Sequence, residues 1–553
     1  MCMLWSRKVN TVNRLKLIGI LCFFIPVAVV LQLVNLQTLR HEEFTTRSQK
    51  RVYTKTKENV FRGRILDRNG NILAESLRSY AIAVSKNNVK DKTLTLDILA
   101  KNLHVDLSFL NKQWRNKKNF FYVKKNATPI EYEQLINEIR SNKISGIEIE
   151  PRYSRIYPYG VAQDIIGSTN SENIGFSGIE LMYNDILSDK KEGKLVKKAR
   201  DGGIIYEAGQ EDTNEAADVY LTIDALGQYF TEETLKYYAE KFKVKNAFAI
   251  VQDSYTGEVL AAASYPYRDG RSLPFQFIYE PGSTFKTIAV AAALDTNTIK
   301  PNDTYSMENN KFNVSGIIIK DHQDKPSLSV TEILEVSSNI GAAKIALQLG
   351  AKKLYTYFKK FGFGVKSNVN FLSESSGILR DHTTWKPIDT AKAGYGYTVS
   401  ASGIQIVTAY SAIGNGGALM QAHLISKIKY PSGKEDILAA PMRVREVLKS
   451  STIKSLKKML ISVVENGTAK AAQMPAYKVA GKTGTTEKLM ETGKYEKRAH
   501  IASFCGFVPA EKPRLTILVV LDEPEKSLFG SMSAKIFSEI AAKFLTLYPE
   551  VNE

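Results

Sequence analysis

Residues 280–294 read EPGSTFKTIAVAAAL. A Pro-Gly pair precedes Ser283, and the chain from Thr284 to Leu294 is apolar on almost every side of a helix. A helix that is apolar all round is buried in a core, so we predict a buried helix that begins at Ser283. Ser283 then lies at the positive end of the helix dipole, where developing negative charge is stabilised.

Lys286 follows Ser283 by three residues, which places both side chains on one face of the helix, one turn apart and within hydrogen-bond reach. Its neighbours are apolar, so burial should lower the pKa of the lysine and let a neutral amine accept the serine proton. This pattern is typical of an activated serine nucleophile. A serine N-cap beside a lysine that extends to solvent is the structural alternative.

A second motif, Ser337-Ser338-Asn339, is predicted to lie between two helices. Ser329 and Glu332 form a capping box for a first helix, and a second helix is expected from about Gly341. Ser337 and Asn339 would then project from the connection. The Ser337 hydroxyl can relay a proton to a leaving group, and the Asn339 amide can orient a substrate peptide carbonyl.

The third motif runs from Lys482 to Thr485 in a predicted strand, with glycines where a ligand backbone can approach closely, Gly484 among them. A period of two puts Thr483 and Thr485 on one side as donors to a carboxylate, and Lys482 adds a positive charge. The backbone N–H groups of Ser283 and Thr485 are the natural pair for an oxyanion hole. A phosphate loop is excluded because Ala476 stands where that motif requires glycine.

Short apolar runs around these motifs predict strands. Residues 247–252 and 258–264 flank a Ser-Tyr-Thr-Gly turn and should form a hairpin. A strand is also expected at 218–224. Three further strands and a helix are predicted near the end of the chain, in the order 478–486, 500–508, 515–521 and 533–547. The predicted fold class is therefore α+β, an antiparallel sheet flanked by helices.

The N-terminal part of the chain predicts a membrane anchor. Residues 17–37 are predominantly apolar, and basic residues precede them, so we predict a cytoplasmic tail over 1–16, a transmembrane signal anchor over 17–37 and the bulk of the chain outside. A buried helix of a soluble protein is the alternative. Residues 38–217 mix helical and strand patterns, including an Asn69-Gly70 hairpin signal, and are predicted to form an elongated domain before a second domain over 218–549.

Composition excludes several functions. The net charge of +18 is spread along the 553 residues without a nucleic-acid-binding motif, so we predict no nucleic-acid partner. The six histidines lack metal-ligand spacing, and we predict neither metal nor cofactor. Cys505 lies in an apolar run and is predicted to be a buried small hydrophobe.

Together the motifs resemble those of class B penicillin-binding proteins, most closely the division-septum (FtsI-like) branch. The resemblance rests on Glu280 to Lys286, Ser337 to Gly341 and Gly481 to Thr485, and on pedestal-like stretches at 62–74, 155–158 and 178–180. It implies a peptidoglycan D,D-transpeptidase of the bacterial cytoplasmic membrane, with an extracytoplasmic catalytic domain carried on a pedestal. Ser283 would attack the penultimate D-Ala of a stem peptide, and the acyl-enzyme would pass to an amine of a neighbouring stem.

The resemblance also implies the binding partners: peptidoglycan stem peptides on a lipid-linked precursor polymer, β-lactams, a multi-spanning membrane glycosyltransferase and other division proteins. An elongation-type relative, a D,D-carboxypeptidase and a serine β-lactamase or β-lactam sensor stay open as alternatives. A non-enzymatic scaffold is disfavoured because Ser283, Lys286 and Lys482 are all present.

Overall fold

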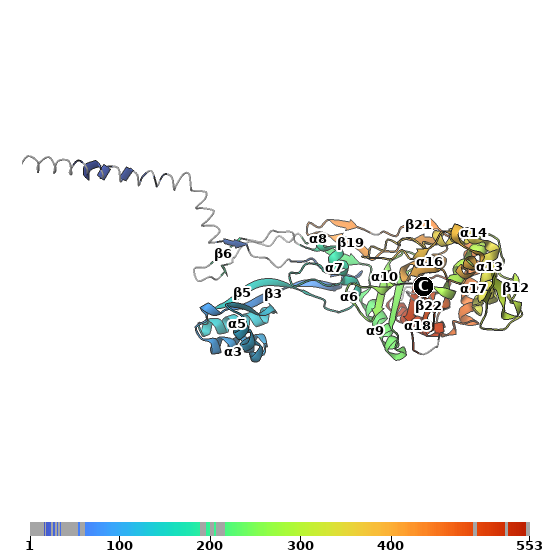
Figure 1. Cartoon of the computed structure of the whole chain (residues 1–553), viewed down its shortest axis with the longest axis horizontal. Coiled ribbons are helices and arrows are strands. Elements are labelled where there is room, and N and C mark those ends of the chain that lie inside the picture. The colour runs from blue at the N-terminus through green and yellow to red at the C-terminus, as the bar shows by residue number, and fades with distance from the viewer. Residues whose placement is uncertain are drawn as a thin grey trace, which may run out of the picture.

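The computed structural model describes residues 61–188, 216–438, 440–489, 495–525 and 529–548, with three short strands outside them and isolated helical positions between 16 and 34. Figure 1 shows an elongated molecule, with a small head around α3 and α5 at one end and the larger domain at the other. The predicted anchor over 17–37 lies largely outside the described residues. Among the helices that are described, none has both the length and the apolar character to cross a bilayer.

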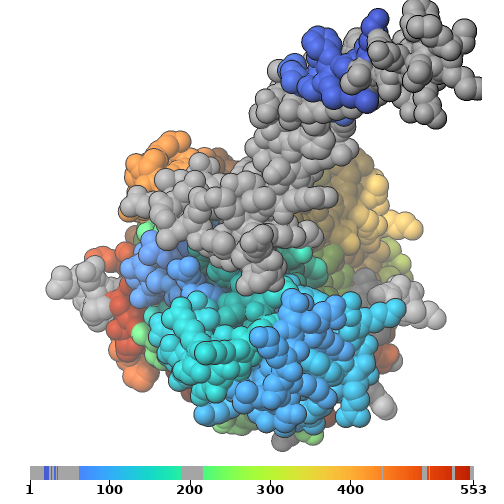
Figure 2. Space-filling model, turned by 90° about the vertical axis from the view of Figure 1, so that its left-hand side faces the viewer, coloured from blue at the N-terminus to red at the C-terminus, as the bar shows by residue number. Residues whose placement is uncertain are grey.

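The head packs three helices against a three-stranded sheet and faces the viewer in Figure 2. The strands are β3 (Ile72–Ser85), β4 (Phe120–Ala127) and β5 (Ile147–Ile156), and the helices are α3 (Lys92–Leu103), α4 (Leu107–Asn116) and α5 (Pro129–Ser141). Each helix begins after a residue whose side chain accepts a backbone N–H, and Thr128 with Glu131 forms a capping box for α5. The head has a hydrophobic core of its own.

One long sheet joins the head to the larger domain. Its strand order is β20-β19-β8-β2-β3-β4, with β5 on the other edge of β3. The predicted Asn69-Gly70 hairpin is confirmed, since β2 (Ile65–Leu66) turns into β3 there. The strand β8 (Asp218–Leu221) pairs with β2 on one side and with β19 (Ile425–Lys429) on the other, and β20 spans Glu435–Ile437. The sheet thus crosses the boundary predicted at 217/218, which stays a prediction.

The larger domain is built on an antiparallel sheet with the order β10-β9-β24-β23-β22. Its strands are β9 (Asn246–Asp253), β10 (Val259–Tyr265), β22 (Ala480–Leu489), β23 (Tyr495–Val508) and β24 (Leu515–Asp522). All five were expected from the apolar runs, and their antiparallel pairing confirms the predicted sheet.

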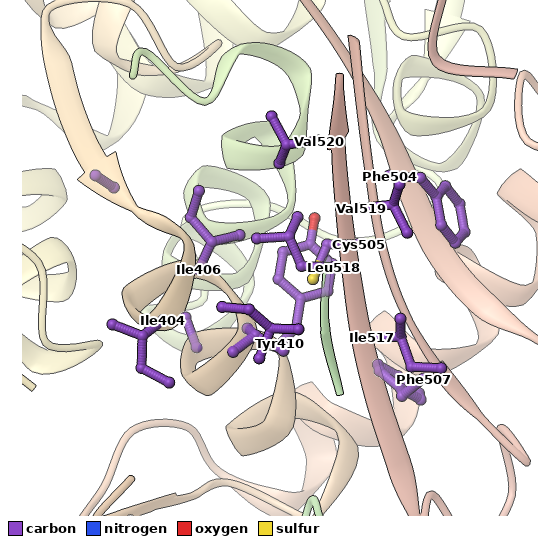
Figure 3. Close-up of a cluster of buried hydrophobic side chains, with 14 of the residues drawn as sticks. Ile404, Ile406, Tyr410, Phe504, Cys505, Phe507, Ile517, Leu518, Val519 and Val520 are labelled. Carbon is purple, nitrogen blue, oxygen red and sulfur yellow. The ribbon is translucent and has the colours of Figure 1, made fainter. Parts of the chain in front are cut away.

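Helices cover this sheet. Two of them, α9 (Ala225–Phe242) and α18 (Phe529–Leu547), pack against each other and the strands, while α16 (Gly403–Gly414) packs on β9, β23 and β24. In Figure 3, Cys505 extends toward Tyr410 of α16, whereas Phe504 extends from the opposite face. The Phe504 ring lies 4.8 Å from that of Phe537 on α18. Cys505 is fully buried, as predicted for a small hydrophobe.

The predicted central helix is α11 (Lys286–Asp295), and every residue in it is buried. The start differs from the prediction, because residues Gly282–Phe285 form a 3₁₀ turn before the α-helix begins at Lys286. The helices that pack against α11 are α12 (Val330–Glu335), α13 (Asn339–Leu349), α14 (Ala351–Lys360) and α17 (Ser450–Glu465), and α15 (Pro387–Ala393) packs against α13. Short strands β13 (Phe312–Val314) and β14 (Ile317–Ile319) form a hairpin before α12.

Candidate active site

Ser283 lies in the 3₁₀ turn that leads into α11 and is half-buried. Two close approaches hold this turn. Gly282 has φ +57, its N–H donates to the Gly396 carbonyl at 3.0 Å, and a Cβ on it would meet the Thr486 side chain at 2.2 Å. Only glycine fits that position. The nucleophile candidate is therefore fixed directly against β22.

Lys286 is buried and bonded to the second motif. Its Nζ lies 2.5 Å from the Ser337 carbonyl oxygen, 2.7 Å from Asn339 Oδ1 and 3.2 Å from Ser337 Oγ. Burial lowers the pKa of Lys286 to about 7, against a smaller raising effect of the Asp321 charge. The lowered pKa was predicted, but no hydrogen bond within the described residues joins the Ser283 hydroxyl to the Lys286 amine; the Lys286 backbone N–H donates to the Ser283 carbonyl oxygen instead.

The three hydrogen-bond contacts of the Lys286 amine depend on whether the amine is protonated. An ammonium has three N–H donors, which match the three acceptors around Nζ. A neutral amine has two donors and one lone pair, so one contact must reverse direction. The carbonyl oxygen and the amide Oδ1 only accept, so the Ser337 hydroxyl is the one group of the three that can donate to the amine. The geometry thus couples the Ser337 hydroxyl to the charge of Lys286.

The second motif sits at a helix junction, as predicted, with two differences. The capping box of Ser329 and Glu332 is present, but α13 already begins at Asn339, and Ser338 caps it by accepting the Gly341 N–H. Ser337 adopts φ +62, an unusual left-handed conformation that turns the chain sharply between α12 and α13. Both the carbonyl and the hydroxyl of Ser337 reach Lys286 in this turn.

Asp321 supports the junction and was missed by sequence reasoning. Its carboxylate accepts the Asn339 N–H at 2.5 Å, the Ile340 N–H at 3.1 Å and the Ser338 hydroxyl. An aspartate at a helix N-terminus satisfies free N–H groups and complements the dipole. Asp321 precedes the helix by eighteen residues and reaches it only because the β13–β14 hairpin folds back, so no local spacing indicates it.

Lys482 is fully buried in β22. Its Nζ contacts the carbonyl oxygen of Thr483 at 3.2 Å and its Oγ1 at 3.5 Å. Burial, and then repulsion from Lys286, hold the pKa of Lys482 well below its ordinary value. The positive charge expected from the sequence is therefore disfavoured at Lys482, and the role of Lys482 stays a prediction.

The remaining residues of the third motif lie against the nucleophile turn. A Cβ on Gly484 would meet the Pro281 carbonyl oxygen at 3.0 Å and the Thr284 side chain at 3.1 Å, which brings the strand beside the turn. Thr483 is buried, with its hydroxyl 2.9 Å from that of Thr468, while Thr485 is half-exposed. β22, α13 and α16 lie in the same part of the molecule (Figure 1).

Glu280 is a second residue to which the sequence assigned no role. Its carboxylate accepts the Thr398 N–H at 2.7 Å and the Tyr495 hydroxyl at 2.9 Å. Burial raises the pKa of Glu280, and the two hydrogen bonds oppose that effect. Glu280 thus ties the loop around Gly396 and the start of β23 to the chain just before Ser283. Across the described residues, no group of His, Cys, Asp or Glu side chains is arranged to hold a metal ion.

Comparison with known proteins agrees with this architecture. Residues 247–542 match the family described as penicillin binding protein transpeptidase domain, and residues 57–221 match the penicillin-binding protein dimerisation domain. The chain therefore belongs to the penicillin-binding protein transpeptidase family, and the two domains together make it a class B member.

Relatives and solved structures of this family cover most of the chain. The probable peptidoglycan D,D-transpeptidase PbpC of Pseudomonas aeruginosa is 30% identical over 96% of this chain and 94% of its own. The peptidoglycan D,D-transpeptidase FtsI of Escherichia coli is 28% identical over 87% of this chain and 82% of its own. The crystal structure of penicillin binding protein 2X from Streptococcus thermophilus shares the fold, with a TM-score of 0.75 and 24% identity over 89% of this chain and 81% of that chain.

Proposed function

We propose that this chain is a peptidoglycan D,D-transpeptidase of septal cell-wall synthesis, anchored in the bacterial cytoplasmic membrane by residues 17–37. The observation that carries the proposal is the buried Lys286 amine, bonded to Ser337 and Asn339 and one turn from Ser283, with a pKa of about 7. About half of such amines are neutral near pH 7, and the neutral form is the one that can act as a general base.

The proposed reaction has two acyl transfers. Ser283 Oγ gives its proton to the neutral Lys286 amine and attacks the carbonyl carbon of the penultimate D-Ala, forming an ester while the peptide bond to the terminal D-Ala breaks. The backbone N–H groups of Ser283 and Thr485 stabilise the oxyanion. The proton returns through Ser337 to the leaving D-Ala nitrogen. An amine of a second stem then attacks the ester carbonyl carbon, the new amide bond forms while the ester bond to Ser283 Oγ breaks, and the proton lost by the amine passes through Lys286 to Ser283 Oγ.

Substrate placement follows from the same motifs. Asn339 would orient a stem-peptide amide, and Thr483, Gly484 and Thr485 would bind the terminal carboxylate along β22. The carboxylate would also favour the charged form of Lys482, whose pKa is lowered by burial and by the charge of Lys286. Lipid-linked precursor polymer, β-lactams, a multi-spanning glycosyltransferase and other division proteins are the proposed partners, with the membrane itself.

Labelling with a fluorescent penicillin tests the nucleophile. In membranes from cells that express the chain, we expect a stable covalent adduct on the wild type and none on Ser283→Ala at equal abundance. Ser451→Ala removes an exposed hydroxyl at the start of α17 and should label normally. Labelling of Ser283→Ala would reject the assignment, and rapid hydrolysis of the adduct would favour a β-lactamase.

The septal role is supported by the similarity to relatives named FtsI and needs a separate test. Depletion should give filaments with unfinished septa, and a fluorescent fusion should gather at mid-cell. Rounded cells with dispersed fusion would favour the elongation branch. The carboxypeptidase alternative is distinguished on paired stem peptides, where release of D-Ala without a cross-linked product would contradict transpeptidation.

A further inference from the structure

A cavity of about 270 Å³, lined mainly by polar residue types, lies among residues 125–173 of the pedestal, the domain predicted over 38–217, and outside the proposed active site. Its walls come from the end of β4, from β5 and from residues 168–173. The volume equals that of roughly nine liquid waters, enough for one sugar ring or a small organic acid. Serine, threonine, asparagine and tyrosine side chains make up most of the lining, so donors of hydrogen bonds surround the space.

Next to this cavity lies a buried cluster of two arginines and one glutamate whose charges do not cancel. Two buried guanidinium groups share one carboxylate: Arg62 lies 2.8 Å and Arg155 2.6 Å from oxygens of Glu180, and the three side chains are at most 2% exposed. The triad therefore carries one net positive charge. A buried charge without a partner is costly, and the cost falls when an anion pairs with it.

Arg155 brings that charge to the cavity. Its Nε and Nη1 are bonded to Glu180 and to the Gly63 carbonyl oxygen, whereas its buried Nη2 has no acceptor within the described part of the chain. Arg155 lines the cavity, and Lys125 adds a second positive charge at the exposed rim. None of the eleven lining residues, all of them described, is acidic, and the nearby Glu172 is not a lining residue.

We propose that this cavity binds an oxyanion, a carboxylate or phosphate group carried on a small polar molecule. The anion would pair with the positive charges of Arg155 and Lys125, and the hydroxyl and amide groups of the wall would donate hydrogen bonds to it and bind the rest of the molecule. This inference does not rest on the proposed function, because the cavity shares no residue with the catalytic motifs.

The cavity wall is connected to the larger domain. The Ser168 hydroxyl, which belongs to the lining, donates to Asp269 at 2.6 Å, and Asn173 Nδ2 donates to the Tyr153 carbonyl oxygen at 3.1 Å. Residues 168–173 thus contact β5 on one side and the loop after β10 on the other. An anion bound here would lie at the junction between the pedestal and the larger domain.

Calorimetric titration of the full-length protein in detergent micelles tests the site. The probes are inorganic phosphate, N-acetylmuramic acid as a carboxylate on one sugar, and N-acetylglucosamine as the matching neutral sugar. We expect at least one anionic probe to bind and the neutral sugar not to bind. The probe that binds tells a phosphate source from a carboxylate source, and a neutral sugar that binds as well as the anions would overturn the proposal.

Variants locate the binding. Lys125→Met should weaken it about two- to fivefold, the usual effect of one exposed charge, while Lys118→Met, an exposed lysine outside the cavity, should not change it. Arg155→Met should abolish binding. Because that variant also loses the Glu180 contact, Ser171→Trp, which fills the rim, provides a second test with the triad intact. Absence of binding by both anionic probes to the wild type, or binding unchanged by Lys125→Met and Ser171→Trp, would reject the site.

Discussion

Acylation of Ser283 by a penicillin should depend on pH through the single proton of Lys286. Burial lowers the pKa of Lys286 to about 7, and only the neutral amine accepts the serine proton. The neutral fraction is about one-eleventh at one pH unit below the pKa and about ten-elevenths at one unit above it. The second-order rate constant should therefore rise about tenfold from about pH 6 to about pH 8 and then level off.

Stopped-flow acylation of the full-length protein measures this profile, and two variants assign it. Lys286→Arg keeps a charge but offers no base, so we expect a rate lower by about 10²–10⁴ and no rise with pH. Lys457→Gln is the matched control, because burial also lowers the pKa of Lys457, which lies on α17 with its Nζ over the Phe507 ring. The control should keep the wild-type profile.

Two results would refute this reasoning. A rate that is flat or falls between about pH 6 and about pH 8 would mean that a neutral Lys286 is not the base. A profile that changes in Lys457→Gln and stays unchanged in Lys286→Arg would mean that the titrating proton belongs to Lys457 and not to Lys286. A midpoint well above 7 and still below the ordinary lysine value of 10.5 would instead mean that the Asp321 charge offsets more of the burial effect on the Lys286 pKa.

Three further predictions concern residues around the site and the domain junction. Asp321→Asn should move the midpoint of the acylation profile to lower pH, because it removes the charge that raises the Lys286 pKa. The asparagine Oδ1 can still accept the Asn339 and Ile340 N–H groups, so the thermal midpoint should change little; an unmoved profile contradicts this. Glu280→Ala should destabilise the protein by about 1–3 kcal/mol in thermal unfolding, because the Thr398 N–H and the Tyr495 hydroxyl lose their acceptor. Glu280→Gln should lose less stability, since an amide oxygen can still accept; equal losses of stability would contradict this reasoning. Asp164 is buried and its pKa is raised to about 7, so the folded protein loses stability relative to the unfolded chain as pH rises from about 4 to about 7. The free energy of unfolding of Asp164→Asn, measured with denaturant, should therefore gain on that of the wild type over this range, by at most about 4 kcal/mol. A difference that stays constant between about pH 5 and about pH 8 would contradict this prediction.

Much of the fold could be predicted because the signals are local. Each strand of the central sheet is an apolar run between turn residues, and α11 can be predicted because its sequence has no polar face. The capping box at Ser329 likewise needs only residues three positions apart. These features depend on side chains that are near in sequence, so periodicity and composition are enough to find them.

The remaining features depend on residues far apart in the chain. Asp321 meets Asn339, Glu280 meets Tyr495, and β8 pairs with β2 more than 150 positions earlier. None of these pairs lies within the three or four residues that link neighbours on one helix face or one strand. The state of Lys482 was missed for a related reason: the strand pattern gives its position, but its pKa depends on burial and on the charge of Lys286, which only the folded chain supplies.

The nucleophile turn shows why this distant packing matters for catalysis. Gly282 and Gly396 both have positive φ, and a Cβ on Gly396 would meet the Gly282 carbonyl oxygen at 2.1 Å. A Cβ on Gly484 would meet the Pro281 carbonyl oxygen at 3.0 Å and the Ser503 hydroxyl at 2.3 Å. Three backbones thus meet with no room for a methyl group, which leaves the Ser283 turn little freedom to shift. Because a misplacement of about 1 Å can lower a rate by about 10²-fold, we expect a side chain at any of these three glycines to slow the proposed acylation of Ser283.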